Sequence, residues 1–112
     1  MPEQKRMNAG ELSELYQGIL HLNREAFEGG VYDASYHLLM AALHCAQKLS
    51  DTQKLNEVGQ LAKTQLEWID AHAPEYEHST AASSQRGHPN IYQNLISQTR
   101  ARQAFLHSVS KS

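Results

Sequence analysis

Histidine is the residue type in this chain with the most potential for site chemistry. Seven histidines occur in 112 residues, and helical bundles build metal sites from side chains on facing helices. His37 and His44 are seven residues apart, which places them on one face of a helix but about 10.5 Å apart along its axis. One ion cannot join them without further ligands. They are candidate metal ligands, and the alternative is a pair of hydrogen-bonded histidines at the surface or core edge.

A second possible metal signal is the segment Glu75-Tyr76-Glu77-His78, which places a glutamate three residues before a histidine. A carboxylate-bridged di-metal bundle needs two Glu-x-x-His pairs on separate helices. The chain offers this pair alone, and it follows a proline in a polar segment. The sequence therefore does not predict that kind of centre.

Two further histidines stand near groups with which they could react or pair. His21 and Glu25 are four residues apart, which predicts a surface pair worth about 0.2–0.5 kcal/mol. Cys45 follows His44, but adjacent helical positions point about 100° apart, a poor arrangement for a nucleophile and its base. We interpret Cys45 as a buried and inert thiol.

The C-terminal segment contains an arginine five residues before a histidine, in Arg102-Gln103-Ala104-Phe105-Leu106-His107. This segment resembles the Arg-x4-His motif of HEPN-type four-helical ribonucleases. The resemblance implies that Arg102 and His107 act on an RNA backbone, and it makes them candidate catalytic residues. Five arginines and seven histidines also give roughly one such spacing by chance in a chain of this length.

Other motifs point to packing rather than catalysis. The segment from Gly30 to Tyr36, followed by Ala41-Ala42-Leu43, is similar to the second helix of a tetratricopeptide-type hairpin, which we interpret as close helix packing. The sequence shows no glycine-rich phosphate loop, Cys-x-x-Cys pair or Gly-x-Ser-x-Gly elbow in a recognisable frame. We therefore predict no cofactor, and the balance moves from catalysis toward binding or assembly.

The elements that would position these residues are helices, because apolar residues recur at steps of three and four. The spacing predicts an all-α, antiparallel, up-and-down bundle of four main helices. The second helix carries apolar residues on two flanks and is expected to be central. The predicted ranges are 9–28, 32–49, 52–72 and 90–109. The clearest apolar strip, expected to face the core, is Leu12, Leu15, Ile19, Leu22 and Ala26.

The segments between and beyond these helices are polar. Gly29-Gly30 is expected to stop the first helix and reverse the chain. Residues 73–89 are expected to form a long polar loop with at most one short helical turn, starting at Pro74. The last helix is expected to pack at both ends, through Ile91 and Phe105 among others, and to be wetter between them. Residues 1–7 are interpreted as a flexible N-terminus.

Composition limits the class of protein. A chain of 112 residues fits a single domain. The net charge of −2 argues against nucleic acid as a partner, since no overall positive field attracts phosphates. The sequence has no apolar run long enough to predict a membrane span or a secretory signal. The single cysteine fits a reducing compartment, and we expect a cytoplasmic protein.

The sequence-based hypothesis for function is a non-enzymatic interaction or scaffold module. The predicted partner is a second copy of the chain, in a homodimer, or another protein. The reason is that the helices carry more apolar and aromatic side chains than a single core-facing strip needs, and such residues are enriched at interfaces. The alternatives are the ribonuclease or other nucleic-acid-processing domain with Arg102 and His107, and a metal- or small-ligand-binding bundle with His37 and His44. The candidate interface residues are Tyr16, Leu20, Phe27, Tyr36 and Trp68.

Overall fold

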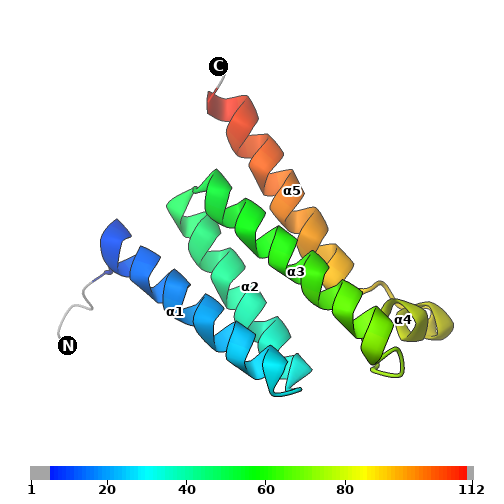
Figure 1. Ribbon diagram of the computed structural model, residues 1–112. Coiled ribbons are helices and arrows are strands. Elements are labelled where there is room, and N and C mark those ends of the chain that lie inside the picture. The colour runs from blue at the N-terminus through cyan, green and yellow to red at the C-terminus, as the bar shows by residue number, and fades with distance from the viewer. Residues whose placement is uncertain (1–5, 111–112) are drawn as a thin grey trace, which may run out of the picture.

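The structure, a computed structural model, describes residues 6–110. Within this range it contains five helices and no strand: α1 (Ala9–Glu28), α2 (Tyr32–Leu49), α3 (Thr52–His72), α4 (Thr80–Arg86) and α5 (Ile91–Ser110). The four long helices alternate in direction, which confirms the predicted antiparallel all-α bundle (Figure 1). Most of the segment 1–7, expected to be flexible, lies outside the described residues.

The long helices lie side by side in chain order. α2 packs against α1 and α3 and touches α5, while α3 packs against α5. α2 and α3 therefore lie between α1 and α5 (Figure 1), as predicted for the central residues 32–49. None of the helices within residues 6–110 is long and apolar enough to cross a membrane. The largest buried apolar side chains are Tyr16, Leu20, Leu39, Leu43, Leu55, Val58, Ile69, Tyr92 and Leu95.

The turn between α1 and α2 confirms the predicted glycine stop. Gly30 has a φ of 79°, in the left-handed region that glycine adopts without steric cost. The Val31 amide then donates to the Ala26 carbonyl at 2.9 Å. At the other end of α1, the Asn8 side chain accepts from the Glu11 amide at 2.8 Å, and the Glu11 carboxylate accepts from the Asn8 amide at 3.1 Å.

The buried strip of α1 differs from the predicted one. Leu15 and Leu22 are 42 % and 51 % exposed, whereas Tyr16 and Leu20 are fully buried. Leu12 and Ile19 of the predicted strip do pack against the core, half-buried, so the helical period was predicted correctly and the buried face is displaced toward Tyr16 and Leu20. The reason is that the buried line includes a polar residue, Asn23, which the apolar pattern does not assign to the core.

Asn23 belongs to a buried polar triad that joins α1, α2 and α3. Its Nδ2 donates to the Ser35 carbonyl at 2.6 Å and to the Ser35 hydroxyl at 2.8 Å. Gln65 Nε2 donates to Asn23 Oδ1 at 2.7 Å. These bonds satisfy side chains that would otherwise destabilise the core, and they fix the axial register of three helices.

The segment 73–89 is more ordered than predicted. Instead of one helical turn at Pro74, it forms a turn over residues 73–79 and then α4. The Ser79 hydroxyl caps α4 by accepting from the Ala82 amide at 3.1 Å. The Thr80 amide and hydroxyl donate to the Asp70 carboxylate at 2.8 and 2.6 Å, which ties α4 to α3. The cap and this tie stabilise a helix that has little apolar surface.

The packing of α5 also differs from the prediction. Tyr92, Leu95 and Thr99 are buried, so the polar middle expected to contact water is shielded from solvent as far as Thr99. Phe105 and Val109, expected to face inward, are 56 % and 54 % exposed. The C-terminal half of α5 extends past the turn between α2 and α3, where little protein remains to cover it (Figure 1).

Candidate functional site

Five aromatic rings gather where α1 ends, α2 begins and α3 ends, and we call them the aromatic cluster. They are Phe27, Tyr32, Trp68, His72 and Tyr76. Ring centroids are 5.5 Å apart for Phe27 and Trp68, and 5.3 Å apart for Tyr32 and Tyr76. The His72 imidazole stacks on the Trp68 indole at 4.5 Å, with 19° between the planes. Edge-to-face and stacked pairs of this kind add to the energy of simple burial.

The outer part of the aromatic cluster is open to solvent. Trp68 is 42 % exposed, whereas Phe27, Tyr32 and Tyr76 are half-buried. The position of His72 is fixed by a second contact, because its Nδ1 lies 3.0 Å from the Trp68 carbonyl oxygen. The neighbouring rings and this contact therefore hold the exposed indole in place.

The five candidate interface residues are distributed between the core and the surface. Tyr16 and Leu20 belong to the core of the single chain, and the Tyr16 hydroxyl donates to the Glu57 carboxylate at 2.6 Å. Tyr36 is half-buried and packs edge-on against Tyr92, with ring centroids 5.4 Å apart. Phe27 and Trp68 meet in the aromatic cluster, so these two remain candidates at the surface.

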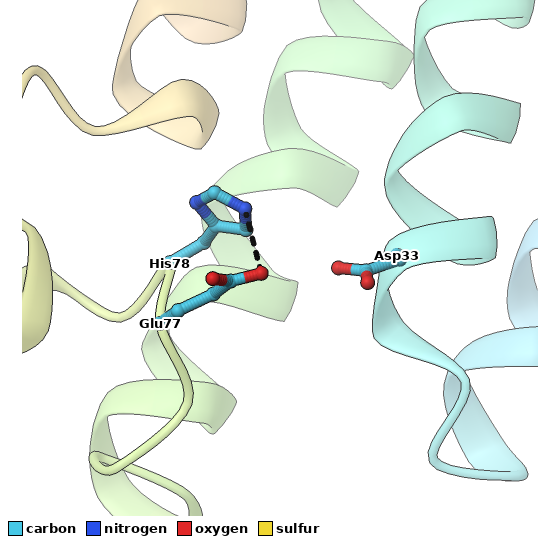
Figure 2. A group of neighbouring side chains, drawn as sticks. All are labelled: Asp33, Glu77 and His78. Carbon is cyan, nitrogen blue, oxygen red and sulfur yellow. Dashed lines mark ion pairs between the residues drawn. The ribbon is translucent and has the colours of Figure 1, made fainter.

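A second group lies next to the aromatic cluster: Asp33, in the first turn of α2, and Glu77 and His78, in the turn before α4. We call these residues the Asp33 cluster. One potential ligand atom from each lies within 4.8 Å of the others. Figure 2 shows the Glu77 carboxylate pointing toward Asp33, with His78 above it and paired to it at 3.5 Å. Within residues 6–110, this is the one group of three potential metal ligands.

The Asp33 cluster lines a shallow hollow of about 320 Å³ that also includes Tyr36, His37 and Ile91. Its two sides are held in place by hydrogen bonds. The Tyr76 hydroxyl donates to Asp33 Oδ1. Asn90 Nδ2 donates to the His78 carbonyl at 2.8 Å, which fixes the turn that carries the histidine.

The negative charge of Asp33 contributes to a raised pKa at two tyrosines. Burial, the hydrogen bond to Asp33 and nearby charge raise the pKa of Tyr76. Burial and the negative charge of Asp33 likewise raise the pKa of Tyr92. Tyr92 is fully buried, and its hydroxyl has no hydrogen-bond partner in the part of the chain that the structure describes. An unpaired buried hydroxyl is costly, and sites that bind ligands are one place where such groups occur.

Comparisons with protein-family models, curated proteins and solved structures each give no match.

His37 and His44, the two candidate metal ligands predicted from the sequence, lie in different surroundings. Both are exposed on α2. His37 lines the hollow beside Asp33, whereas His44 is about 10.5 Å further along the helix and belongs to neither the hollow nor the Asp33 cluster.

Arg102 and His107 are both exposed on α5. Five helical positions separate their directions by about 140° around the axis. The Arg102 guanidinium lies 5.7 Å from the Phe105 ring centroid, which is a cation–π contact within the helix. The two residues therefore start from different flanks of α5, and their catalytic role stays a prediction.

The remaining sequence-based candidates have structural roles. His21 and Glu25 form an exposed pair at 3.2 Å. Cys45 is buried, and burial raises the pKa of its thiol, which disfavours the reactive thiolate.

Neither Asp33 nor the pairing of Glu77 with His78 was predicted from the sequence. In the tetrapeptide Glu75–His78, the Glu-x-x-His spacing involves Glu75. The carboxylate that pairs with His78 belongs instead to its direct neighbour, Glu77. Asp33 joins them only because α2 begins beside the turn that follows α3. No local spacing signals a contact across 43 positions, the separation of Tyr76 and Asp33.

Proposed function

We propose that this protein is a non-enzymatic interaction module that forms a homodimer through the aromatic cluster. The observation that carries this proposal is Trp68, which stays 42 % exposed although other aromatic rings support it closely. Tryptophan is enriched at the energetic centres of protein interfaces. A rigid, supported indole also loses little conformational entropy when a partner covers it.

The proposed partner is a second copy of the chain. Most soluble oligomers are closed homodimers, in which one patch meets the same patch across a two-fold axis. The stacked pair of Trp68 and His72 leaves aromatic surface open to solvent, because Trp68 is 42 % exposed. We propose that the same aromatic surface on a second copy covers it.

Light scattering on the purified chain at micromolar concentration tests this proposal. We expect a dimer mass, and we expect Trp68→Gln to weaken the dimer by at least about tenfold, the size of effect typical of an interface hot spot. Phe105→Gln is the matched control, since Phe105 is 56 % exposed in the C-terminal half of α5, outside the aromatic cluster. A monomeric wild-type chain, or a dimer lost with Phe105→Gln but kept with Trp68→Gln, contradicts the proposal.

Intrinsic fluorescence gives a second readout, because Trp68 is the single tryptophan of the chain. Burial of the indole in a dimer shifts its emission to shorter wavelength as the protein concentration rises. Emission that does not change over the concentration range in which the mass doubles would place the interface elsewhere.

We also propose a cytoplasmic location. The chain has one cysteine, and it is a buried free thiol. A protein whose stability does not depend on disulfides is suited to a reducing compartment.

A further inference from the structure

We propose that Asp33, Glu77 and His78 bind one divalent transition-metal ion of the zinc class in the hollow beside α2. The three donor atoms lie within 4.8 Å of one another. Bonds of about 2.0–2.1 Å at tetrahedral angles place neighbouring donors about 3.3 Å apart. Small side-chain rotations are therefore enough to convert the arrangement in Figure 2 into a coordination shell.

The donor set selects the class of ion. Two carboxylates and one imidazole offer oxygen and nitrogen but no sulfur, a combination that suits zinc and related first-row ions. Calcium and magnesium prefer shells made of oxygen alone. Three protein ligands leave a fourth position open. His37 lies one helical turn after Asp33 and lines the same hollow, so its imidazole or a water molecule can complete the shell.

An independent observation points to a ligand at this place. The fully buried Tyr92 hydroxyl lacks a hydrogen-bond partner among the described residues. The Tyr92 ring packs on Tyr36, which lines the hollow, so Tyr92 lies in the layer of side chains directly behind it. Within this proposal, we assign a water molecule of the ion's shell as the polar partner of the Tyr92 hydroxyl, which the described residues do not supply.

The ligands are also prepared for binding. Tyr76 donates to Asp33 Oδ1, which leaves Oδ2 for the ion and orients the carboxylate. Hydrogen bonds to metal ligands of this kind are known to increase metal affinity. Glu77 is shared, since its Oε1 faces His78 and its Oε2 lies 3.4 Å from Arg86. Arg86 competes with a cation for Glu77 and reduces the affinity of the site without blocking Oε1.

Calorimetric titration of the metal-free, tag-free chain with Zn²⁺ tests the proposal. We expect one ion per chain, with affinity lowered at least tenfold by His78→Ala and by Asp33→Asn. His21→Ala is the matched control, because His21 is exposed and pairs with a carboxylate at 3.2 Å but has no third ligand nearby. Far-UV circular dichroism shows whether each variant keeps its helices.

The control and the wild type also define the outcomes that overturn the proposal. Absence of stoichiometric Zn²⁺ binding by the wild-type chain refutes it. Equal losses with His78→Ala and His21→Ala also refute it, because they indicate scattered surface binding.

Tyr92→Phe provides a second test that does not depend on removing a ligand. Removing the unpaired hydroxyl is expected to raise the denaturant midpoint of the metal-free chain while lowering its affinity for Zn²⁺. A purely structural role for Tyr92 predicts a change in the midpoint with no change in the titration, and that result contradicts the assigned contact with the metal site.

Discussion

Asn23 of α1 and Gln65 of α3 hold each other in the centre of the bundle. Gln65 Nε2 donates to Asn23 Oδ1 at 2.7 Å, and Asn23 Nδ2 lies 3.3 Å from Gln65 Oε1. Both side chains are buried, so neither can exchange its partner for bulk water. Loss of Gln65 leaves Asn23 Oδ1 without its donor in the core, although Asn23 Nδ2 keeps its bonds to Ser35.

The first prediction follows from this pairing. Gln65→Leu is expected to lower the free energy of unfolding by about 1–3 kcal/mol, because it removes the donor to the buried Asn23 Oδ1. The double variant with Asn23→Leu is expected to be destabilised by less than the sum of the single changes, since no unpaired amide remains. Urea denaturation measures all three variants. Additive effects would show that the two residues contribute independently.

The second prediction concerns the close approach of α3 and α5 at Gly59. A Cβ atom added at Gly59 would lie 2.6 Å from Thr99 Oγ1. Gly59→Ala is therefore expected to cost about 1–3 kcal/mol through overpacking, and Thr99→Ala in the same chain should recover part of the loss. Thermal denaturation followed by circular dichroism gives the values.

Gly18 is the control for that change. It lies within α1, and nothing comes within 4 Å of a Cβ added there. Gly18→Ala is expected to stabilise the chain by up to about 1 kcal/mol, because alanine favours a helix interior more than glycine does. Similar effects at Gly18 and Gly59 would contradict the close packing of α3 against α5.

The third prediction is a loss of stability at alkaline pH that depends on Tyr92. Burial and the charge of Asp33 raise the pKa of Tyr92 in the folded state. The unfolded chain, with a tyrosine pKa of about 10, loses this proton first. The contribution of Tyr92 is therefore complete below about pH 10 and is lost as the pH rises further.

Urea denaturation at a series of pH values checks this dependence against Tyr92→Phe. Above about pH 10 the wild type is expected to lose stability faster than the variant, by at most about 1.4 kcal/mol per pH unit. Parallel curves for the two proteins would mean that Tyr92 ionises equally easily in the folded and unfolded states.

The fourth prediction concerns the charge beside the proposed metal site. Arg86→Gln removes the cation that lies 3.4 Å from Glu77, in an ion pair whose two side chains are about half exposed. Exposed pairs contribute about 0.2–1 kcal/mol, so the variant is expected to bind Zn²⁺ about 1.4- to 5-fold more tightly. Calorimetry measures the change, and Arg24→Gln, which alters an exposed arginine of α1, is the control for net charge. Equal tightening in both variants would show a general effect of charge.

The helices were predictable because their ends and their apolar period are local properties. Asn8 and Glu11, three residues apart, mark the start of α1, and Gly30, two residues after its last residue, marks its stop. The face that α1 buries was not predictable in the same way. Leu15 and Leu22 belong to an apolar strip as regular as the one that contains Tyr16, and only the partners of Asn23 on α2 and α3 decide between them.

The candidate site was harder to predict because its residues come from distant parts of the chain. Phe27 and Trp68 were predicted as interface residues from their type, yet their contact depends on α1 and α3 ending beside each other. Asp33 carries no signal of its own, since an aspartate in the first turn of a helix is common for electrostatic reasons. Its role becomes visible only when the turn with Glu77 and His78 is placed next to it.

The uneven burial along α5 has a consequence for local opening. Residues 100–109 contain no fully buried side chain, whereas Tyr92, Leu95 and Thr99 are inaccessible to solvent. The last turns of the helix can therefore unwind without separating α5 from α3, so their amide protons should exchange with deuterium much sooner than those around Leu95. A ligand or a second protein that binds the C-terminal end of α5 would slow the exchange of these amide protons.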